Sequence, residues 1–121
     1  MGDEYNLKKI VKIVHPEIQS RMNNFIKKNK NKKIVVLDIP LLMENKINKK
    51  DDILIFVDAK KKEIDKRLKK KLNFNSKILK KFKELQLPVE FKKRKSSFVI
   101  KNNFRNNFIK ENVKQVLEKI L

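Results

Sequence analysis

Residues 35–45 read VVLDIPLLMEN: an apolar run reaches Asp38, turns at Pro40 and continues as Leu41, Leu42 and Met43 before Glu44. Ile34–Leu37 is a short, mostly β-branched run, typical of a strand buried on both faces. The carboxyl end of such a strand is where open α/β sheets bind ligands. Asp38 is therefore interpreted either as a holder of a metal-bound water or a substrate hydroxyl, or as a cap of the turn before Pro40.

Two more apolar runs predict strands, Ile53–Val57 and Ser97–Ile100. Apolar spacing predicts helices between and around the strands, over 6–14, from Pro16 to about residue 26, around 64–68, over 76–85, over 88–95 and over 109–120. Proline suits the first helical turn, so a new helix is expected to start at Pro16. Strands that alternate with helices predict an α/β fold with a parallel sheet. With no repeat and no Gly-, Pro- or Ser-rich linker, we expect one domain over residues 1–121.

The composition excludes several kinds of site. The chain has no cysteine and one histidine, His15, so it can form neither a disulfide nor a thiolate metal centre, and we expect no metal-binding site built by the protein alone. Its apolar runs are too short to span a membrane, and no apolar segment follows the acidic N-terminus as in a secretory signal. We expect a protein of the reducing cytoplasm.

The net charge is +19, from 33 lysines and arginines against 14 acids. Such a charge fits a polyanionic partner, and a small basic nucleic-acid-binding protein is the alternative function to consider. However, lysine is spread along the whole chain and is accompanied by much asparagine and isoleucine, as in proteins of AT-rich genomes. Arginines are few and the eight phenylalanines mostly fall on apolar stripes, so binding to nucleic acid is the less favoured interpretation.

An ordered series of short blocks covers nearly the whole chain. The blocks are an HP dipeptide at His15-Pro16, a PLL-x-E segment at Pro40, Leu41, Leu42 and Glu44, a VDA at Val57–Ala59, an R-L pair at Arg67-Leu68, a Gln86 with Pro88 and Lys92, and a VIKN ending at Asn102. Any one block is weakly specific, whereas the series in order is quite specific. In this order and spacing the blocks resemble the dephospho-CoA kinase family.

The resemblance implies a P-loop kinase-like, three-layer parallel-sheet fold, with a lid over about 60–95 and a C-terminal helix. The family transfers a phosphoryl group from ATP, with Mg²⁺, to the 3′-hydroxyl of dephospho-CoA in the last step of coenzyme A synthesis. By resemblance, catalytic phosphate contacts fall to Arg67 and Lys71, which we expect on one face of a helix. A nucleotide contact near the adenine falls to Asn102, and Asp38 stays open between a Mg²⁺ role and a structural cap. The acceptor substrate is expected to be bound by His15, Pro40, Leu41, Leu42 and Glu44.

The chain departs from the family at two decisive points. Its single glycine, Gly2, excludes a G-x-x-x-x-G-K-[ST] phosphate loop within these residues. Lys71 also stands where the family resemblance predicts a second arginine. Lysine keeps the positive charge but lacks the planar guanidinium fork. The phosphate loop follows a central strand in such kinases, so we expect an incomplete sheet, marginal stability and no kinase activity from this chain alone. A complementary N-terminal chain with the phosphate loop is a possible partner.

Overall fold

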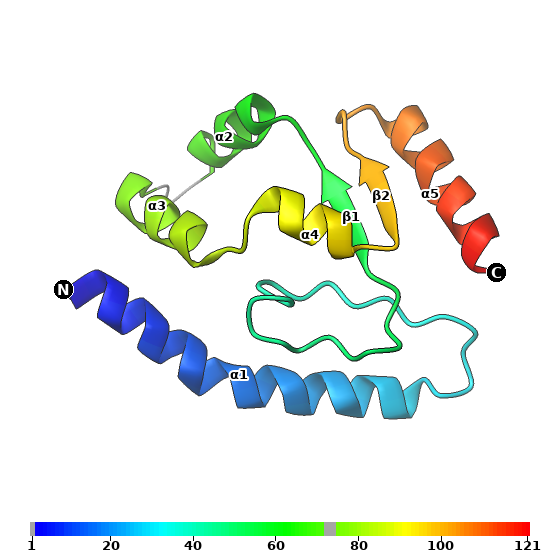
Figure 1. The fold of residues 1–121 in the computed structure, drawn as a ribbon, viewed down its shortest axis with the longest axis horizontal. Helices are drawn as coiled ribbons and strands as arrows, with labels where there is room; N and C mark the ends of the chain where they lie inside the picture. The colour runs from blue at the N-terminus through cyan, green and yellow to red at the C-terminus, as the bar shows by residue number, and fades with distance from the viewer. Residues whose placement is uncertain (1, 72–74) are drawn as a thin grey trace.

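The computed structural model describes residues 2–71 and 75–121, and the side chains of residues 2–8, 10 and 11 are left aside. Within these ranges the chain forms a two-stranded parallel sheet and five helices (Figure 1). The elements are α1 (Gly2–Lys28), β1 (Ile55–Asp58), α2 (Lys61–Lys69), α3 (Ser76–Leu85), α4 (Val89–Lys95), β2 (Phe98–Lys101) and α5 (Asn106–Ile120). The α/β class predicted from the sequence is confirmed, and the small parallel sheet is consistent with part of a P-loop kinase-like fold.

The sheet consists of β1 and β2, which pair in parallel with Ile55 opposite Phe98 and Val57 opposite Ile100. Both predicted strands are confirmed, each displaced by one or two residues. Three helices, α2, α3 and α4, lie between the two strands along the chain, as a parallel connection requires. Helix α5 then packs on β2, where Ile100 and Val116 are both buried.

The helices of the connection begin where their sequences predict. Asn75 caps α3, because its side-chain Oδ1 accepts hydrogen bonds from the backbone N–H groups of Lys77 and Ile78 at 3.0 and 3.2 Å. Pro88 precedes α4 at the N-cap position, where a missing N–H costs nothing. Residues 72–74, inside the predicted lid, lie outside the described residues.

The predicted strand over Ile34–Leu37 is wrong. Residues 34–39 are neither helical nor paired with another strand, and Val36 is 78% exposed. A strand exists only when a neighbour accepts and donates its ladder hydrogen bonds. The apolar run is present in the sequence, but these residues have no neighbouring strand to pair with.

The predicted helix start at Pro16 is also wrong. Helix α1 runs without a break through Pro16, and Figure 1 shows it bending near its middle. Proline has no N–H for the helical ladder and its ring crowds the preceding turn, which explains a bend at this position. Of the apolar face expected over residues 6–14, Val14 is 40% exposed, while Leu7, Ile10 and Val11 fall among the side chains left aside.

The core is thin for a chain of this length. Among the described side chains, the buried apolar ones are Met22, Ile47, Ile100 and Val116. The accessible surface is 10637 Å², whereas a compact monomer of this size exposes about 6,900 Å². Large apolar side chains remain exposed along the sheet, including Ile53, Ile55 and Val57. The apolar residues needed for a core are thus present, but much of their surface is not covered.

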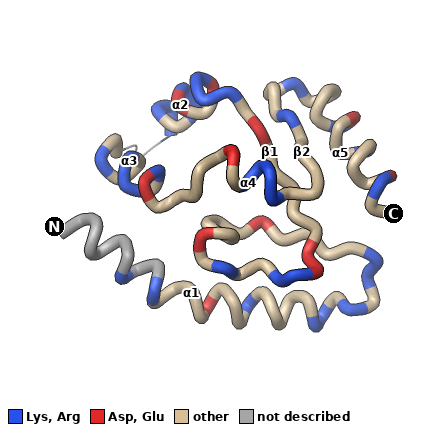
Figure 2. The backbone as a smooth tube through the Cα atoms, viewed as in Figure 1, with Lys and Arg blue, Asp and Glu red and all other residues tan. Residues whose placement is uncertain are grey.

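Positive charge is distributed over the whole molecule. Figure 2 shows lysine and arginine along α1, the turn after it, α2, α3 and α4, and no single element holds them all. This distribution favours compositional bias, rather than a dedicated surface for polyanions, as the origin of the +19 charge.

Candidate functional site

The PLLMEN segment folds into a compact turn rather than the end of a strand. Backbone N–H groups of Asn45, Lys46 and Ile47 donate to the carbonyls of Leu41, Met43 and Leu42 at 3.0–3.1 Å. Leu41 and Lys46 adopt left-handed backbone angles, both with φ of 54°, which closes the turn tightly. Ile47, 2% exposed, is buried at its end and fixes the turn to the rest of the protein.

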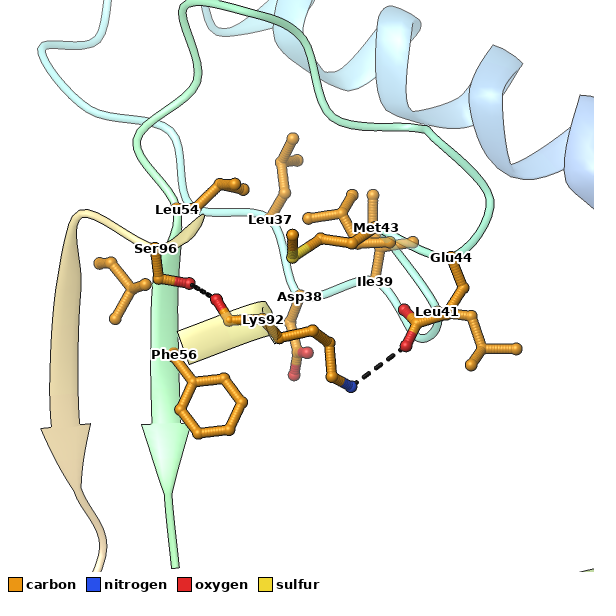
Figure 3. A pocket seen from close by; sticks show the side chains of 12 residues that line it. Leu37, Asp38, Ile39, Leu41, Met43, Glu44, Leu54, Phe56, Lys92 and Ser96 are labelled. Carbon is orange, nitrogen blue, oxygen red and sulfur yellow. Dashed lines mark hydrogen bonds and ion pairs between the residues drawn. The ribbon is translucent and has the colours of Figure 1, made fainter. Parts of the chain in front are cut away.

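Glu44 ties this turn to the segment that leads into α4. Its Oε2 atom accepts a hydrogen bond from the Leu87 backbone N–H at 2.9 Å and lies 3.1 Å from Lys92 Nζ (Figure 3). The two side chains are only 8% and 19% exposed, so water does little to weaken the pair. A contact spanning more than forty residues thereby fixes the distance between two parts of the site.

The electrostatics of Glu44 follow from these contacts. Burial raises the pKa of its carboxyl, but the hydrogen bonds from the Leu87 N–H, its own backbone N–H and Lys92 act in the opposite direction and together leave the pKa below its ordinary value. Glu44 is therefore ionised at neutral pH, and its charge is satisfied inside the protein.

A pocket of about 210 Å³ lies between the turn, the beginning of β1 and α4 (Figure 3). Eight of its twelve lining residues are apolar and four carry polar side chains, although polar atoms make up at least as much of its exposed lining as apolar atoms do. The apolar residues are Leu37, Ile39, Leu41, Leu42, Met43, Leu54, Ile55 and Phe56, and the polar ones are Asp38, Glu44, Lys92 and Ser96.

A second group of polar residues gathers at the carboxyl edge of the sheet, where both parallel strands end. The backbone carbonyl of Asp58, the last residue of β1, accepts a hydrogen bond from the Asn102 backbone N–H at 2.7 Å. The side-chain carboxylate of Asp58 lies 2.9 Å from Lys93 Nζ. The hydrogen bond that Lys93 Nζ donates to the Asp58 carboxylate raises the pKa of Lys93. Lys92 and Lys93, neighbours on α4, thus connect the pocket with the carboxyl edge.

Arg67 also reaches this edge from α2. Its Cζ atom lies 3.7 Å from the centroid of the Phe104 ring, within the range of a cation–π contact. Phe104 follows Asn102 in the turn between β2 and α5, and its N–H donates to Asn102 Oδ1 at 2.9 Å. Among the described residues no carboxylate pairs with Arg67.

The structure brings together some of the predicted site residues and separates others. Asp38, Leu41, Leu42 and Glu44 line one pocket, whereas Pro40 is exposed beside it. This pocket lies at the beginning of β1 and not at the carboxyl ends of the strands, so the predicted placement of Asp38 at a strand end is wrong. Because residues 34–39 do not join the sheet, their end is not aligned with its carboxyl edge.

Three other predicted residues lie elsewhere. His15 is in the middle of α1 and not beside the helix start that was expected at Pro16, and its buried Nε2 has no hydrogen-bond partner among the described residues. Asn102 lies with Arg67 at the carboxyl edge. Lys71 follows the end of α2 at Lys69, and its N–H donates to the Leu68 carbonyl at 3.2 Å. The expectation that Arg67 and Lys71 share one helical face is therefore wrong.

Sequence reasoning missed the contributions of Lys93 and Phe104, and it set Lys92 aside as structural or part of a lid. Four consecutive basic residues close α4, and nothing in the sequence distinguishes the two that meet carboxylates. Phe104 did carry a signal, since it is an aromatic residue within the polar stretch NNFRNN instead of an apolar stripe.

Two other kinds of feature are absent from the described residues. They contain no group of three His, Asp or Glu side chains close enough together to hold a metal ion. In the same residues, no helix combines the length and the hydropathy that a bilayer crossing requires.

Comparison with known families gives a match over most of the chain. The family model described as dephospho-CoA kinase matches residues 2–111. The matched range contains the pocket, the carboxyl edge and all the blocks from which the resemblance was inferred.

Curated relatives agree with this match. The chain is 30% identical over 117 residues to a dephospho-CoA kinase of Wolbachia sp. subsp. Brugia malayi, covering 95% of this chain and 60% of that protein. It is 31% identical over 123 residues to the enzyme of the same name from Bartonella quintana, covering 100% of this chain and 63% of that protein. With a Bacillus anthracis dephospho-CoA kinase it shares 33% identity over 112 residues. The chain thus spans about 60% of the length of the first two of these relatives.

Proposed function

This chain belongs to the dephospho-CoA kinase family, and from that premise we propose that it forms the acceptor-side wall and the lid of such an enzyme. The complete enzyme would transfer the γ-phosphoryl group of ATP to the 3′-hydroxyl of dephospho-CoA, the last step of coenzyme A synthesis. Cytoplasmic location belongs to the same proposal and is supported by a sequence without cysteine.

The observation that carries the proposal is the pairing of the Glu44 carboxylate with the Leu87 N–H and Lys92 Nζ inside the protein. Because Leu87 and Lys92 fix its carboxylate, the turn over residues 40–46 holds Leu41, Leu42 and Met43 along one wall of the pocket. Such an apolar wall suits the pantetheine arm of the acceptor, which is long and largely uncharged. Glu44 therefore acts as a support of the wall rather than as a group that touches the acceptor.

The phosphate contacts are proposed at the other end of the site. Arg67 is the first candidate, because its guanidinium fork suits phosphate oxygens and has no carboxylate partner among the described residues. Asn102 lies beside it and would border the adenine, while Lys71 would add a point charge. His15 remains a proposed contact of the acceptor, and Asp38 stays open between a Mg²⁺ role and the structural role of a turn cap.

The donor side of the reaction needs groups that these residues do not supply. ATP and Mg²⁺ are the proposed nucleotide and ion of the complete enzyme, but a sequence with one glycine holds no phosphate loop. Among the described residues no three His, Asp or Glu side chains gather and Asp58 is paired with Lys93, so the Mg²⁺ would be held mainly by the phosphates of ATP and at most one or two carboxylates. We therefore expect no kinase activity from this chain alone, and a chain that carries the phosphate loop is the proposed partner.

Binding of dephospho-CoA to the pocket can be tested by NMR of the purified chain labelled with ¹³C at the methionine methyl groups. Met43 lines the pocket, whereas Met22 is buried in α1 and does not line it. We expect dephospho-CoA to shift the Met43 signal in a saturable way and to leave the Met22 signal in place. A Leu42→Ala variant should weaken binding several-fold, and Val113→Ala on α5 is the matched control.

Two results would contradict the proposal. One is equal movement of both methionine signals, or of neither, over the titration. The other is ADP formation from ATP that depends on dephospho-CoA, is catalysed by the pure chain and is lost in Arg67→Gln. This second result would show that the chain needs no phosphate-loop partner.

A further inference from the structure

The contact between Arg67 and Phe104 is the closest approach of a cation to a ring among the described residues. Arg67 Cζ lies 3.7 Å from the ring centroid, while Arg94 Cζ and Lys95 Nζ lie 5.9 and 5.8 Å from the ring of Phe91. At 3.7 Å the flat guanidinium can only lie against the face of the ring, whereas the other two pairs are loose. The contact joins α2 to the turn after β2.

Phe104 is held in this place against its own backbone preference. Its φ is 61°, in the left-handed region that is unfavourable for a residue with a Cβ atom. The turn is maintained by two side-chain hydrogen bonds, from the Phe104 N–H to Asn102 Oδ1 at 2.9 Å and from the Arg105 N–H to Asn103 Oδ1 at 3.0 Å. A half-buried ring held by a fixed turn is a rigid surface for the guanidinium.

The stacked arrangement leaves the hydrogen-bonding edge of Arg67 available. The N–H groups of a guanidinium point outward in its plane, so a ring that covers the face does not compete with them. No carboxylate among the described residues pairs with Arg67. A pre-oriented fork with free donors is what a phosphate group with several oxygens requires.

We propose that Phe104 is a positioning residue for Arg67, whose guanidinium it holds flat so that the N–H edge faces the oxygens of a phosphate chain. This inference rests on the proposed function in one respect, the assignment of a phosphate contact to Arg67. Phe104 itself touches no substrate in this scheme and acts through Arg67 alone.

The test combines a spectroscopic readout with anion binding by the full chain. In NMR spectra, the Arg67 side-chain protons should be shifted upfield by the ring current of Phe104, and Phe104→Leu should abolish this shift. Titration with inorganic tripolyphosphate at one moderate salt concentration should give a Kd weakened by about two- to fivefold in Phe104→Leu, the range expected for an exposed cation–π contact. Phe104→Tyr retains the ring and should bind like the unmodified chain.

Three further variants separate a positioning role from a merely structural one. Phe91→Leu removes a half-buried ring with only loose cation contacts and should leave tripolyphosphate binding unchanged. Phe104→Gly suits the left-handed backbone and removes the ring, so it should bind as weakly as Phe104→Leu even if the leucine variant folds poorly. Arg67→Gln should weaken binding, and adding Phe104→Leu to it should cause no further loss.

The outcomes distinguish this proposal from the one on which it rests. If Arg67→Gln weakens binding but Phe104→Leu and Phe104→Gly do not, the positioning role is wrong and the phosphate role of Arg67 stands. If Arg67→Gln leaves binding unchanged, both are wrong. Equal losses in Phe104→Leu and Phe104→Tyr would also overturn the proposal, because the tyrosine keeps the ring face.

Discussion

At the scale of single residues, Glu44 shows how a predicted binding residue can have a different task. The sequence placed it beside the apolar trio, and a polar contact with the acceptor was the natural expectation. In the structure the Oε2 atom of its carboxylate accepts from the Leu87 N–H and pairs with Lys92 Nζ. A carboxylate that is 8% exposed and already paired has little capacity for a ligand, but it can fix the position of the pocket wall.

Glu44→Gln is expected to destabilise the chain at neutral pH. The variant keeps the shape and loses the charge, and a buried hydrogen bond to a charged group contributes about 1–3 kcal/mol to the free energy of unfolding. Because the folded-state pKa lies below the ordinary value of 4.5, the contribution is complete above pH 4.5 and is lost as the pH falls through the folded-state pKa. Urea unfolding of both proteins at pH 7 and pH 3 should show a difference at pH 7 that is smaller at pH 3.

Glu118→Gln is the matched control, because Glu118 is exposed on α5 and has no partner among the described residues. It should leave the stability unchanged at both pH values. Equal stability of Glu44→Gln and the unmodified chain at pH 7 would show that this carboxylate does not hold the wall.

At the scale of secondary-structure elements, Pro16 decides how α1 is built. Sequence patterns favoured a helix start here, since proline is common in the first turn. The structure instead carries one helix through it, so that Pro16 lacks a ladder hydrogen bond and crowds the preceding turn. The two arrangements predict opposite effects of removing the proline.

Pro16→Ala is expected to stabilise the chain by up to about 3 kcal/mol, because alanine restores the hydrogen bond and relieves the crowding. Circular dichroism at 222 nm should show a higher Tm and at least as much helix as before. Pro88→Ala is the control, since Pro88 precedes α4 and disturbs no helical hydrogen bond. A lower Tm for Pro16→Ala would show that a helix begins at this proline in solution.

At the scale of the whole molecule, the structure has much more surface than a compact fold of this size. Its 10637 Å² exceed the expected value of about 6,900 Å² by roughly half. The excess lies partly along the sheet, where Ile53, Ile55 and Val57 are exposed and Val36 lies in an unpaired extended segment. Burial of apolar surface is the main source of stability, so the isolated chain should be only marginally stable.

Thermal melting followed by circular dichroism tests this expectation. We expect a broad transition of low midpoint for the purified chain, because few side chains are buried well enough to make unfolding cooperative. Binding of ANS, a dye that reports exposed apolar surface, should be strong before the transition. A sharp transition well above 50 °C would contradict the expectation and would require an additional source of stability.

Much of the architecture follows from local sequence alone. The strands β1 and β2, the helix α3, the start of α4 after Pro88 and the C-terminal helix α5 were all predicted, because their signals are short-range. The family resemblance was likewise carried by short blocks in order, and the family match confirms it. The acceptor wall was predicted from the neighbouring residues Pro40, Leu41, Leu42 and Glu44. Of these, Leu41, Leu42 and Glu44 line one pocket and Pro40 does not.

The tertiary structure decided what depends on partners distant in the sequence. The apolar pattern of Ile34–Leu37 is that of a strand, but a strand also needs a neighbour to hydrogen-bond, and none is present for it. Glu44 could be assigned to the support of the wall only when Leu87 and Lys92 were found beside it. Phe104 acquired a role only through Arg67 on another element. Local patterns determine which conformations a segment favours, whereas hydrogen-bond partners, ion pairs and ring contacts between distant segments determine which of them the folded protein uses.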